Sequence, residues 1–164
     1  WSNDEALSRV TKIVETESQV QWRLTTSRRT PAELVKRLQS LSFSNLVVYR
    51  GEETPSDWLP DQLQRASKIW VTEESVSMVY EALTAGGAVG VLPVPRISDT
   101  RVSRGVMKLI DQGWVTSFDD WQTFGDLTPS RETLSEADRC AAMILDRWFA
   151  RHLSQQQKTL DKAA

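Results

Sequence analysis

The sequence predicts a doubly wound α/β domain built around a parallel β-sheet. Short apolar segments of strand length alternate with segments whose apolar residues recur at helical spacing. The strands are almost continuously apolar, as in AVGVLPV at 88–94, which indicates burial on both faces of the sheet. The 164 residues, of which 40% are hydrophobic and 26% charged, suffice for one globular domain with its own core. Helices are therefore expected to cover both faces of one parallel sheet.

Strands are predicted where apolar, β-branched or aromatic residues cluster between turn signals. VQWRLTT alternates apolar and polar residues, KIWVT is short and apolar, and WVTSF has the character of a short edge strand. In chain order, the predicted strands occupy residues 20–26, 45–49, 68–72, 88–94 and 114–118.

Helices are predicted from capping signals and apolar stripes. Ser2 and Glu5 fit a capping box, and Thr30 with Glu33 fits another, in which Pro31 takes the first helical position. Two further helices end on glycine, at Gly86-Gly87 and at Gly113, as helices commonly do. The predicted helices begin after Ser2 and after Thr30, span 56–66, 75–86 and 99–112, and resume at about Thr133.

The last helix is expected to bury one apolar stripe. That stripe consists of Leu134, Ala137, Ala141, Ile144, Leu145 and Trp148. Cys140 lies in the same segment and is expected to be a buried, inert thiol. Trp22 and Trp70 are also assigned to the core. Residues 1–153 are expected to form a single domain, followed by a loose tail at 154–164.

Composition excludes several classes of function. The net charge of −2 argues against nucleic acid as a partner, because phosphate backbones are held by dense Lys/Arg surfaces. A single cysteine cannot form an internal disulfide, which favours a reducing, cytoplasmic compartment. No apolar run approaches the roughly 18 residues of a membrane span, and no signal peptide opens the chain. One histidine and one cysteine make no metal site, and no glycine-rich dinucleotide or phosphate-loop motif occurs.

The predicted topology locates the search for a ligand site. In open α/β sheets, ligands bind beyond the carboxyl ends of the strands. The loops that follow the predicted strands there span 26–31, 50–57, 72–77 and 93–100.

One of these loops leads into a polar helix start within VTEESVSMVYEALTAGG. Val76, Val79, Tyr80 and Leu83 form one stripe that is suited to packing on the sheet. Ser77, Glu81 and Thr84 share a different face, so that Glu81 is expected near the open end of the sheet.

Such a carboxylate can accept both hydroxyls of a ribose, while Ser75, Ser77 and the helix N–H groups can face a phosphate. On spacing alone, the alternative of a solvated Glu81, with the serines as simple caps, is slightly favoured. Glu73 and Glu74 would repel an anion at this helix start, which favours the ribose role over the phosphate role.

A second polar motif, TTSRRTP, follows the first predicted strand. It places Thr26, Ser27, Arg28 and Arg29 between a strand end and a helix start. The planar guanidinium of arginine suits a diphosphate or a carboxylate, and the helix N–H groups point the same way. The alternative is that one arginine pairs with a nearby acid and the other is solvated.

These two motifs carry a resemblance to a known family. TTSRRTP (25–31), together with WVTEESVSMVYEALTAGGAVGVLPV (70–94), closely resembles the ELM-type mitochondrial-fission family, and the resemblance spans roughly residues 1 to 150. Members of this family look like GT-B glycosyltransferases, which have two Rossmann-like domains. Bacterial members are often labelled putative nucleoside-diphosphate-sugar epimerases. The matching portion is the C-terminal half, which in GT-B enzymes holds the nucleotide-sugar donor.

The resemblance implies a site and a missing partner domain. Glu81 matches the glutamate that GT-B relatives place on the donor ribose, and Ser75 and Ser77 match their polar turn. The implied ligand is a nucleotide-diphosphate sugar, with no other cofactor. GT-B C-terminal domains usually open with a strand and a glycine-rich turn, whereas this chain begins directly with a helix, so we expect the first strand and the acceptor-binding N-terminal domain to be missing.

A chain of this kind is expected to bind donor without completing a transfer reaction, so no catalytic residue is assigned. One alternative is a non-catalytic interaction protein that keeps the fold and recruits partners at a membrane surface. It would expose an apolar surface on the helices at 99–112 or 133–153. Another alternative is an epimerase-like enzyme, although the nicotinamide-dependent kind needs the absent glycine motif. The sequence leaves the base, the sugar and the oligomeric state open.

Overall fold

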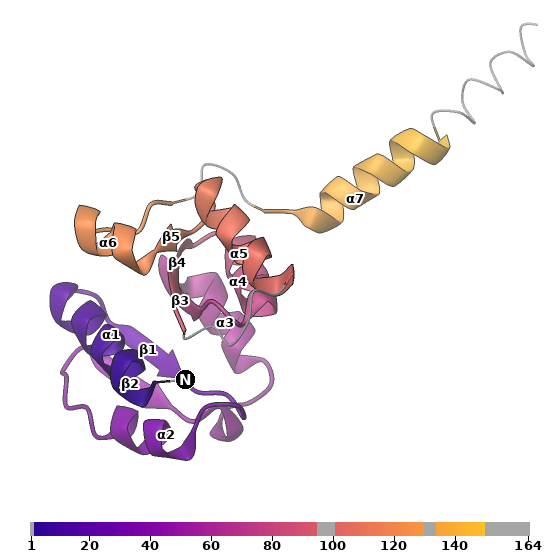
Figure 1. Cartoon of the computed structure of the whole chain (residues 1–164). Helices are drawn as coiled ribbons and strands as arrows, with labels where there is room; N and C mark the ends of the chain where they lie inside the picture. The colour runs from indigo at the N-terminus through magenta and orange to yellow at the C-terminus, as the bar shows by residue number, and fades with distance from the viewer. Residues whose placement is uncertain (1, 95–100, 130–133, 150–164) are drawn as a thin grey trace, which may run out of the picture. The chain divides into compact units, whose positions relative to one another are not determined.

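The computed structural model describes residues 2–94, 101–129 and 134–149. The chain divides into two compact units, residues 1–131 and residues 132–164. Both sheets and the helices that cover them belong to the first unit (Figure 1).

The first sheet pairs two parallel strands. β1 (Trp22–Thr25) lies beside β2 (Leu46–Tyr49), with Trp22 opposite Leu46 and Thr25 opposite Tyr49. The helix α2 (Ala32–Gln39) connects the two strands, and α1 (Asn3–Thr16) precedes them. The hydroxyl of Ser2 accepts the N–H of Glu5 at 3.3 Å, so the predicted cap of the first helix is confirmed.

The second sheet contains three parallel strands in the order β3-β4-β5. These are β3 (Lys68–Thr72), β4 (Ala88–Leu92) and β5 (Thr116–Ser117), connected by α4 (Val76–Ala85) and α5 (Arg101–Asp111). Gly86 ends α4 with a φ of 87°, a left-handed conformation that glycine adopts without strain. The remaining elements are η1 (Gly51–Glu53), α3 (Trp58–Arg65), α6 (Phe118–Phe124), α7 (Glu136–Ile144) and η2 (Leu145–Phe149).

The predicted α/β class with parallel strands is confirmed, and β5 is the short edge strand that WVTSF predicted. The sheet differs from the prediction in one respect. Among the described residues, β1 pairs with β2 and β3 pairs with β4, but β1 and β3 do not pair with each other. The expected single sheet is therefore divided in two.

An aromatic cluster forms the core beneath the second sheet. The ring of Trp70, on β3, packs edge-on against Phe118 at 6.0 Å and against Trp121 at 5.4 Å between ring centroids. Trp22, from β1, packs against the same cluster, so residues of both sheets share one core. Both tryptophans, which the sequence assigned to the core, are partly buried and pack against it.

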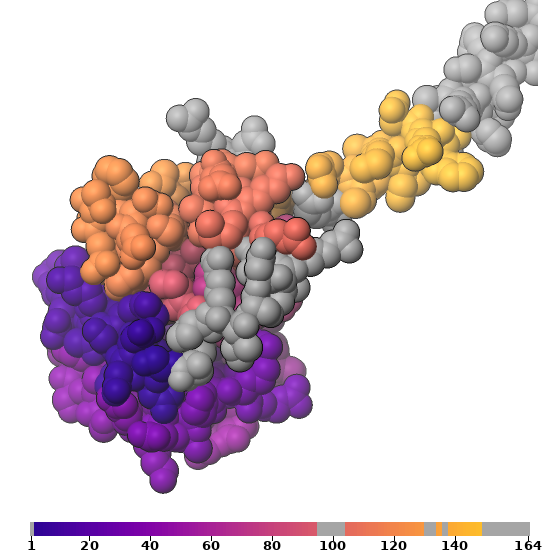
Figure 2. Space-filling model, viewed as in Figure 1, coloured from indigo at the N-terminus to yellow at the C-terminus, as the bar shows by residue number. Residues whose placement is uncertain are grey.

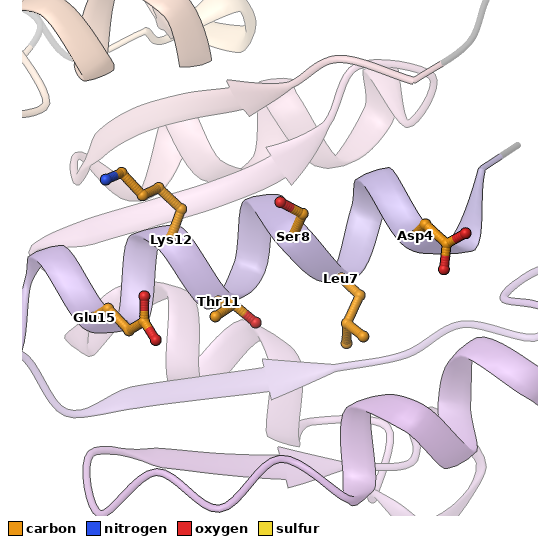
Figure 3. A pocket seen from close by; sticks show the side chains of 6 residues that line it. All are labelled: Asp4, Leu7, Ser8, Thr11, Lys12 and Glu15. Carbon is orange, nitrogen blue, oxygen red and sulfur yellow. The ribbon is translucent and has the colours of Figure 1, made fainter.

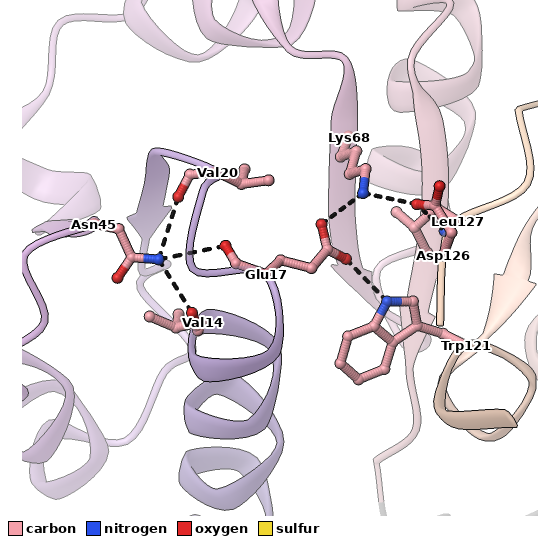
Figure 4. Close-up of polar contacts among 8 residues, drawn as sticks. All are labelled: Val14, Glu17, Val20, Asn45, Lys68, Trp121, Asp126 and Leu127. Atoms are coloured by element: carbon pink, nitrogen blue, oxygen red, sulfur yellow. Dashed lines mark hydrogen bonds and ion pairs between the residues drawn. The ribbon is translucent and has the colours of Figure 1, made fainter. Parts of the chain in front are cut away.

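The carboxylate of Glu17 ties α1 to the second sheet (Figure 4). The side chain, 7% exposed, accepts the indole N–H of Trp121 at 2.9 Å and pairs with the Lys68 ammonium at 2.6 Å. Figure 2 agrees with this contact, since the indigo surface of α1 meets the orange surface of α6. One side chain at the end of α1 thus joins the start of β3 and the helix α6.

A second polar side chain ties the same end of α1 to the first sheet. The amide Nδ2 of Asn45, which directly precedes β2, donates to the carbonyl oxygens of Val14 at 3.0 Å and of Val20 at 3.2 Å. Asn45 is buried, and these bonds satisfy an amide that would be costly to bury alone. The turn at the end of α1 is therefore fixed to both sheets.

Lys68 also pairs with Asp126, at 2.7 Å. Burial by itself would lower the pKa of Lys68, but hydrogen bonds to Asp126 and Glu17 outweigh it, and the pKa is raised above 10.5. The hydrogen bond from Lys68 lowers the pKa of Asp126, against a smaller opposing effect of burial. Both shifts favour the charged forms that make this contact.

The prediction for the last helix is wrong in two respects. Ile144, Leu145 and Trp148 are exposed, the last by 69%, and Cys140 is an exposed thiol. The physical reason is that α7 continues directly into η2, and no other described element of their unit packs on them. An amphipathic pattern shows that a face can be buried, but it does not supply the surface that buries it.

The close packing of Trp70 on β4 yields a prediction. A Cβ at Gly90 would lie 2.6 Å from two ring carbons of Trp70 and 2.8 Å from Leu127, so Gly90→Ala should lower the free energy of unfolding by about 1–3 kcal/mol. Urea denaturation measures this loss. The control is Gly105→Ala in α5, where a Cβ meets nothing within 4 Å and helix propensity predicts a gain of about 0.5–1 kcal/mol. Equal midpoints for the two variants would contradict the packing account.

Candidate functional site

The loops that follow β1, β2, β3 and β4 share one edge of the domain. Glu17, at the end of α1, contacts Lys68 at the start of β3, whereas Arg9, two turns earlier, donates to the carbonyl oxygen of Pro93 just after β4, at 2.6 Å. The strands of the second sheet therefore run antiparallel to α1. β1 also runs antiparallel to α1, because only a short connection separates the end of α1 from the start of β1. All of these strands end at the edge where α1 begins (Figure 3).

Hydrogen bonds to the hydroxyl groups of its own residues stabilise the loop after β1. The Oγ1 of Thr30 accepts the N–H of Ser27 at 2.9 Å, and the Oγ of Ser27 accepts the N–H of Arg29 at 3.2 Å. Thr30 was predicted to cap α2, but α2 has no side-chain cap, because the hydroxyl of Thr30 is used within the loop.

Two cations project from this ordered loop. Arg28 and Arg29 are exposed, and neither guanidinium has a hydrogen bond or ion pair with another described residue. The contrast with Arg50, on the neighbouring loop, is clear, because Arg50 pairs with both Glu52 and Glu53. The two adjacent arginines are therefore available to an anion.

A glycine brings the loops after β1 and β2 into contact. The N–H of Gly51 donates to the Oγ1 of Thr26 at 3.3 Å. A Cβ at Gly51 would lie 2.1 Å from the carbonyl oxygen of Thr26, so no other residue type fits there without movement of the backbone. Thr26 is thereby fixed as the joint between the two loops.

The start of α4 leaves its hydroxyls unused. Ser75 occupies the N-cap position, yet its side chain makes no capping hydrogen bond, and Ser77 is exposed in the first turn. The N-cap side chain therefore leaves the first N–H groups of α4 uncapped, an arrangement that suits an incoming oxygen atom.

Glu81 lies one turn beyond Ser77 and is exposed. The buried face of α4 consists of Val79, Ala82 and Leu83, and Glu81 lies on the opposite face. Tyr80 was predicted to pack on the sheet but is 38% exposed. The structure thus groups Ser77 with Glu81 on α4 and groups Thr26, Ser27, Arg28 and Arg29 on the loop after β1. Among the described residues, no hydrogen bond or ion pair joins the two groups.

Two side chains whose contacts at this edge the sequence did not predict hold the edge together: Arg9, and Glu73, which was expected only to repel an anion. The carboxylate of Glu73 is buried and accepts the N–H of Val94 at 3.1 Å, which fixes the loop after β4 beside the loop after β3. Arg9 reaches the same loop from α1 through Pro93. Neither residue has a local sequence signal, because each bond joins segments that are distant in the chain.

Two hollows among the described residues are lined by other side chains than the predicted site residues. One shallow hollow of about 300 Å³ is lined entirely by α1, namely by Asp4, Leu7, Ser8, Thr11, Lys12 and Glu15 (Figure 3). Another, of about 470 Å³, lies beside Trp58, whose ring packs at 4.7 Å from that of Tyr49. Among the described residues, no group of three or more His, Cys, Asp or Glu could hold a metal ion.

The contact between Gly51 and Thr26 yields a prediction for the edge. Gly51→Ala should push the two loops apart and shift the backbone amide resonances of Thr26 and Ser27 in a ¹H–¹⁵N spectrum. We expect a stability loss of about 1–3 kcal/mol, as overpacking typically costs. Resonances of Thr26 and Ser27 that stay in place, as they should in the Gly105→Ala control, would show that the loops do not depend on this close approach.

The chain was compared with known proteins. Neither a curated protein nor a solved structure matches it significantly. In the part of the chain that the structure describes, no helix has both the length and the apolar character to cross a bilayer. The family model described as Mitochondrial fission ELM1 matches residues 1–148, which is most of the chain. The chain therefore belongs to the Mitochondrial fission ELM1 family.

Proposed function

We propose that this chain is the donor-binding domain of a GT-B-type, glycosyltransferase-like protein and binds a nucleotide-diphosphate sugar at the carboxyl edge of its strands. The observation that carries this proposal is that Arg28 and Arg29, which have no hydrogen-bond or ion partner among the described residues, lie on the same edge as the uncapped start of α4. Parallel α/β sheets bind ligands at this edge.

Each group at the edge suits one part of the ligand. Arginine binds phosphate oxygens with a planar, two-pronged donor set, so Arg28 and Arg29 suit the diphosphate. Ser75 and the first N–H groups of α4 offer further donors to a phosphate oxygen, and Thr26 and Ser27 line the approach. The Glu81 carboxylate accepts hydroxyl protons and suits the ribose, with Ser77 one turn before it.

The local charge permits an anion. Glu73 is buried and its carboxylate is engaged by the N–H of Val94, which leaves Glu74 as the exposed acid at this helix start. Glu74 accepts the hydroxyl of Thr72 at 2.9 Å. Arg28 and Arg29, which have no ion partner among the described residues, therefore remain available to an anion, although Glu74 and Glu81 are exposed acids near the start of α4.

Binding is the activity that we assign to this domain by itself. In a two-domain glycosyltransferase the reaction takes place between the halves, so the acceptor is bound by the other half. We assign no catalytic residue to this chain.

Titration calorimetry with a panel of UDP, GDP, CMP and ADP sugars tests the proposal. At least one member should bind more tightly than about 1 mM, which corresponds to about −4 kcal/mol. Arg28→Ala, Arg29→Ala and Glu81→Gln should each weaken that binding roughly tenfold, the effect of losing about 1.4 kcal/mol from a charged hydrogen bond.

Matched controls remove the same charges at the opposite edge. Arg65 ends α3, shortly before β3 begins, and Glu15 lies near the end of α1. Arg65→Ala and Glu15→Gln should leave the affinity unchanged. Absence of binding across the panel, or equal losses in site and control variants, would refute donor binding at this edge.

A second candidate function is recruitment of a protein partner, and the exposed face of α7 and η2 favours it. Met143, Ile144 and Leu145 are each more than half exposed, and Trp148 is 69% exposed. Large apolar side chains grouped in this way commonly mark interaction sites. If the domain only recruits a partner, Glu81→Gln should not change its affinity for any nucleotide sugar. If it binds donor, the same substitution should weaken that affinity, so the same calorimetry separates the two functions.

A further inference from the structure

A hollow of about 470 Å³ lies beside Trp58, next to the carboxyl end of β2. Trp58 is the first residue of α3, and its ring centroid lies 4.7 Å from that of Tyr49, the last residue of β2. Trp58 is partly exposed and also lines the hollow, so its ring is held in place by Tyr49 and is still accessible to a ligand. The hollow therefore has a fixed aromatic wall.

The backbone around this wall is stiff. Two of the residues that line the hollow are prolines, Pro55 before α3 and Pro60 in its first turn. Proline fixes its φ near about −65°, so the segment on both sides of Trp58 has few conformations to lose when a ligand binds. The hydroxyl of Thr54 also donates to the carbonyl oxygen of Gly51 at 3.0 Å, which closes the loop just before the hollow. The hollow is therefore largely formed before binding.

The polar lining of the hollow includes groups that have no partner among the described residues. Asp57 occupies the N-cap position of α3, yet its carboxylate makes no capping hydrogen bond and no ion pair with another described residue. The amide of Gln64 likewise has no hydrogen-bond partner in the part of the chain that the structure describes. Asp61, by contrast, pairs with Arg65 at 2.7 Å and accepts the amide of Gln62 at 3.1 Å. One carboxylate and one amide therefore remain for a ligand.

These features select the class of ligand. No basic side chain of the described residues lines the hollow, and Asp57 and Asp61 would repel a phosphate. Because Arg65 neutralises Asp61, one unpaired carboxylate remains, and a single exposed carboxylate holds a cation only weakly in water. A neutral sugar ring fits better. Its C–H groups form an apolar face that packs on an aromatic ring, and its hydroxyls bond to carboxylate and amide groups.

We propose that this hollow binds a neutral hexose, which packs its apolar face on the indole ring of Trp58. The Asp57 carboxylate accepts hydrogen bonds from the sugar hydroxyls, and the Gln64 amide both donates to them and accepts from them. Asp61, already paired, shapes the wall of the hollow without binding the sugar. This assignment goes beyond the donor-binding proposal and does not depend on it.

Two sources supply such a ring, namely the hexose of a nucleotide-sugar donor and a separate glycan. The loop before the hollow meets the loop of Arg28 and Arg29 through the hydrogen bond from Gly51 to Thr26, at 3.3 Å. A donor bound by those arginines and an independent glycan are both compatible with this position. The chemistry that the hollow recognises is the same in either case.

NMR titration of the 164-residue chain with methyl glycosides of glucose, galactose, mannose and N-acetylglucosamine tests the proposal. At least one glycoside should shift the indole N–H resonance of Trp58 and bind with a dissociation constant below roughly 10 mM. Trp58→Ala should weaken this binding at least roughly tenfold, whereas Trp58→Phe, which keeps an aromatic face, should weaken it by no more than about threefold. The matched control is Trp148→Ala, which removes an exposed indole elsewhere and should leave the affinity unchanged.

A second variant keeps the test independent of the Trp58 packing. Asp57→Ala removes an exposed carboxylate without a capping bond, so the fold should persist while glycoside affinity falls roughly tenfold. Asp111→Ala, at the exposed end of α5, is its control and should not change the affinity. Glycosides that shift no resonance of residues 55–64, or that bind Trp58→Ala or Asp57→Ala as tightly as the parent chain, would overturn the proposal. Tighter binding of tetramethylammonium than of every glycoside would also overturn it, because that result marks a cation site.

A competition arm identifies the source of the sugar. If a nucleotide sugar that binds the chain displaces the glycoside, the hexose of the donor occupies the hollow. If the two bind together, the hollow takes a separate glycan, and both results support the sugar site. Glycoside binding by a chain that binds no nucleotide sugar supports the hollow and refutes the donor site, whereas donor binding without glycoside binding does the reverse.

Discussion

The arrangement of this domain depends on one buried carboxylate. Glu17 lies at the end of α1, where its two oxygens receive the indole N–H of Trp121 and the ammonium of Lys68. The two sheets are not paired with each other in the described structure, so α1 and the shared core hold them together. A charged group with so little exposure is stable only when its hydrogen bonds are made, and here each bond reaches a different element of the second sheet's layer.

This constraint reaches the opposite edge, where the candidate site lies. Fixing the end of α1 sets the helix axis, and Arg9 then contacts Pro93 at the loop after β4. Glu73 joins that loop to the loop after β3, and Gly51 joins the loops after β1 and β2. These three contacts at the edge are hydrogen bonds between a side chain and a backbone group. Arg28 and Arg29 remain outside those contacts, whereas Arg50 pairs with Glu52 and Glu53, and for this reason the proposed function assigns the anion to Arg28 and Arg29.

The sequence predicted what local patterns encode. Continuous apolar strands such as AVGVL, and Ser2 as the cap of α1, follow from periodicity and short-range hydrogen bonding. It did not predict Glu17, whose partners lie 51 and 104 residues away, or the buried Glu73. The error over Trp148 has a related cause, since a helical stripe does not reveal whether another surface covers it. For the candidate site, the sequence predicted which loops form it and their order along the chain. It did not predict which charged side chains pair with which residues.

The most direct test of this account is a double-mutant cycle between Glu17 and Trp121. Urea denaturation of the parent chain, Glu17→Ala, Trp121→Phe and the double variant gives the coupling free energy of the two side chains. If the hydrogen bond from Trp121 to the Glu17 carboxylate connects α1 to α6 as described, the coupling free energy is about 1.5–3 kcal/mol, the range for a hydrogen bond to a charged group. A coupling below about 0.5 kcal/mol would show that the two side chains act independently, and would contradict the account.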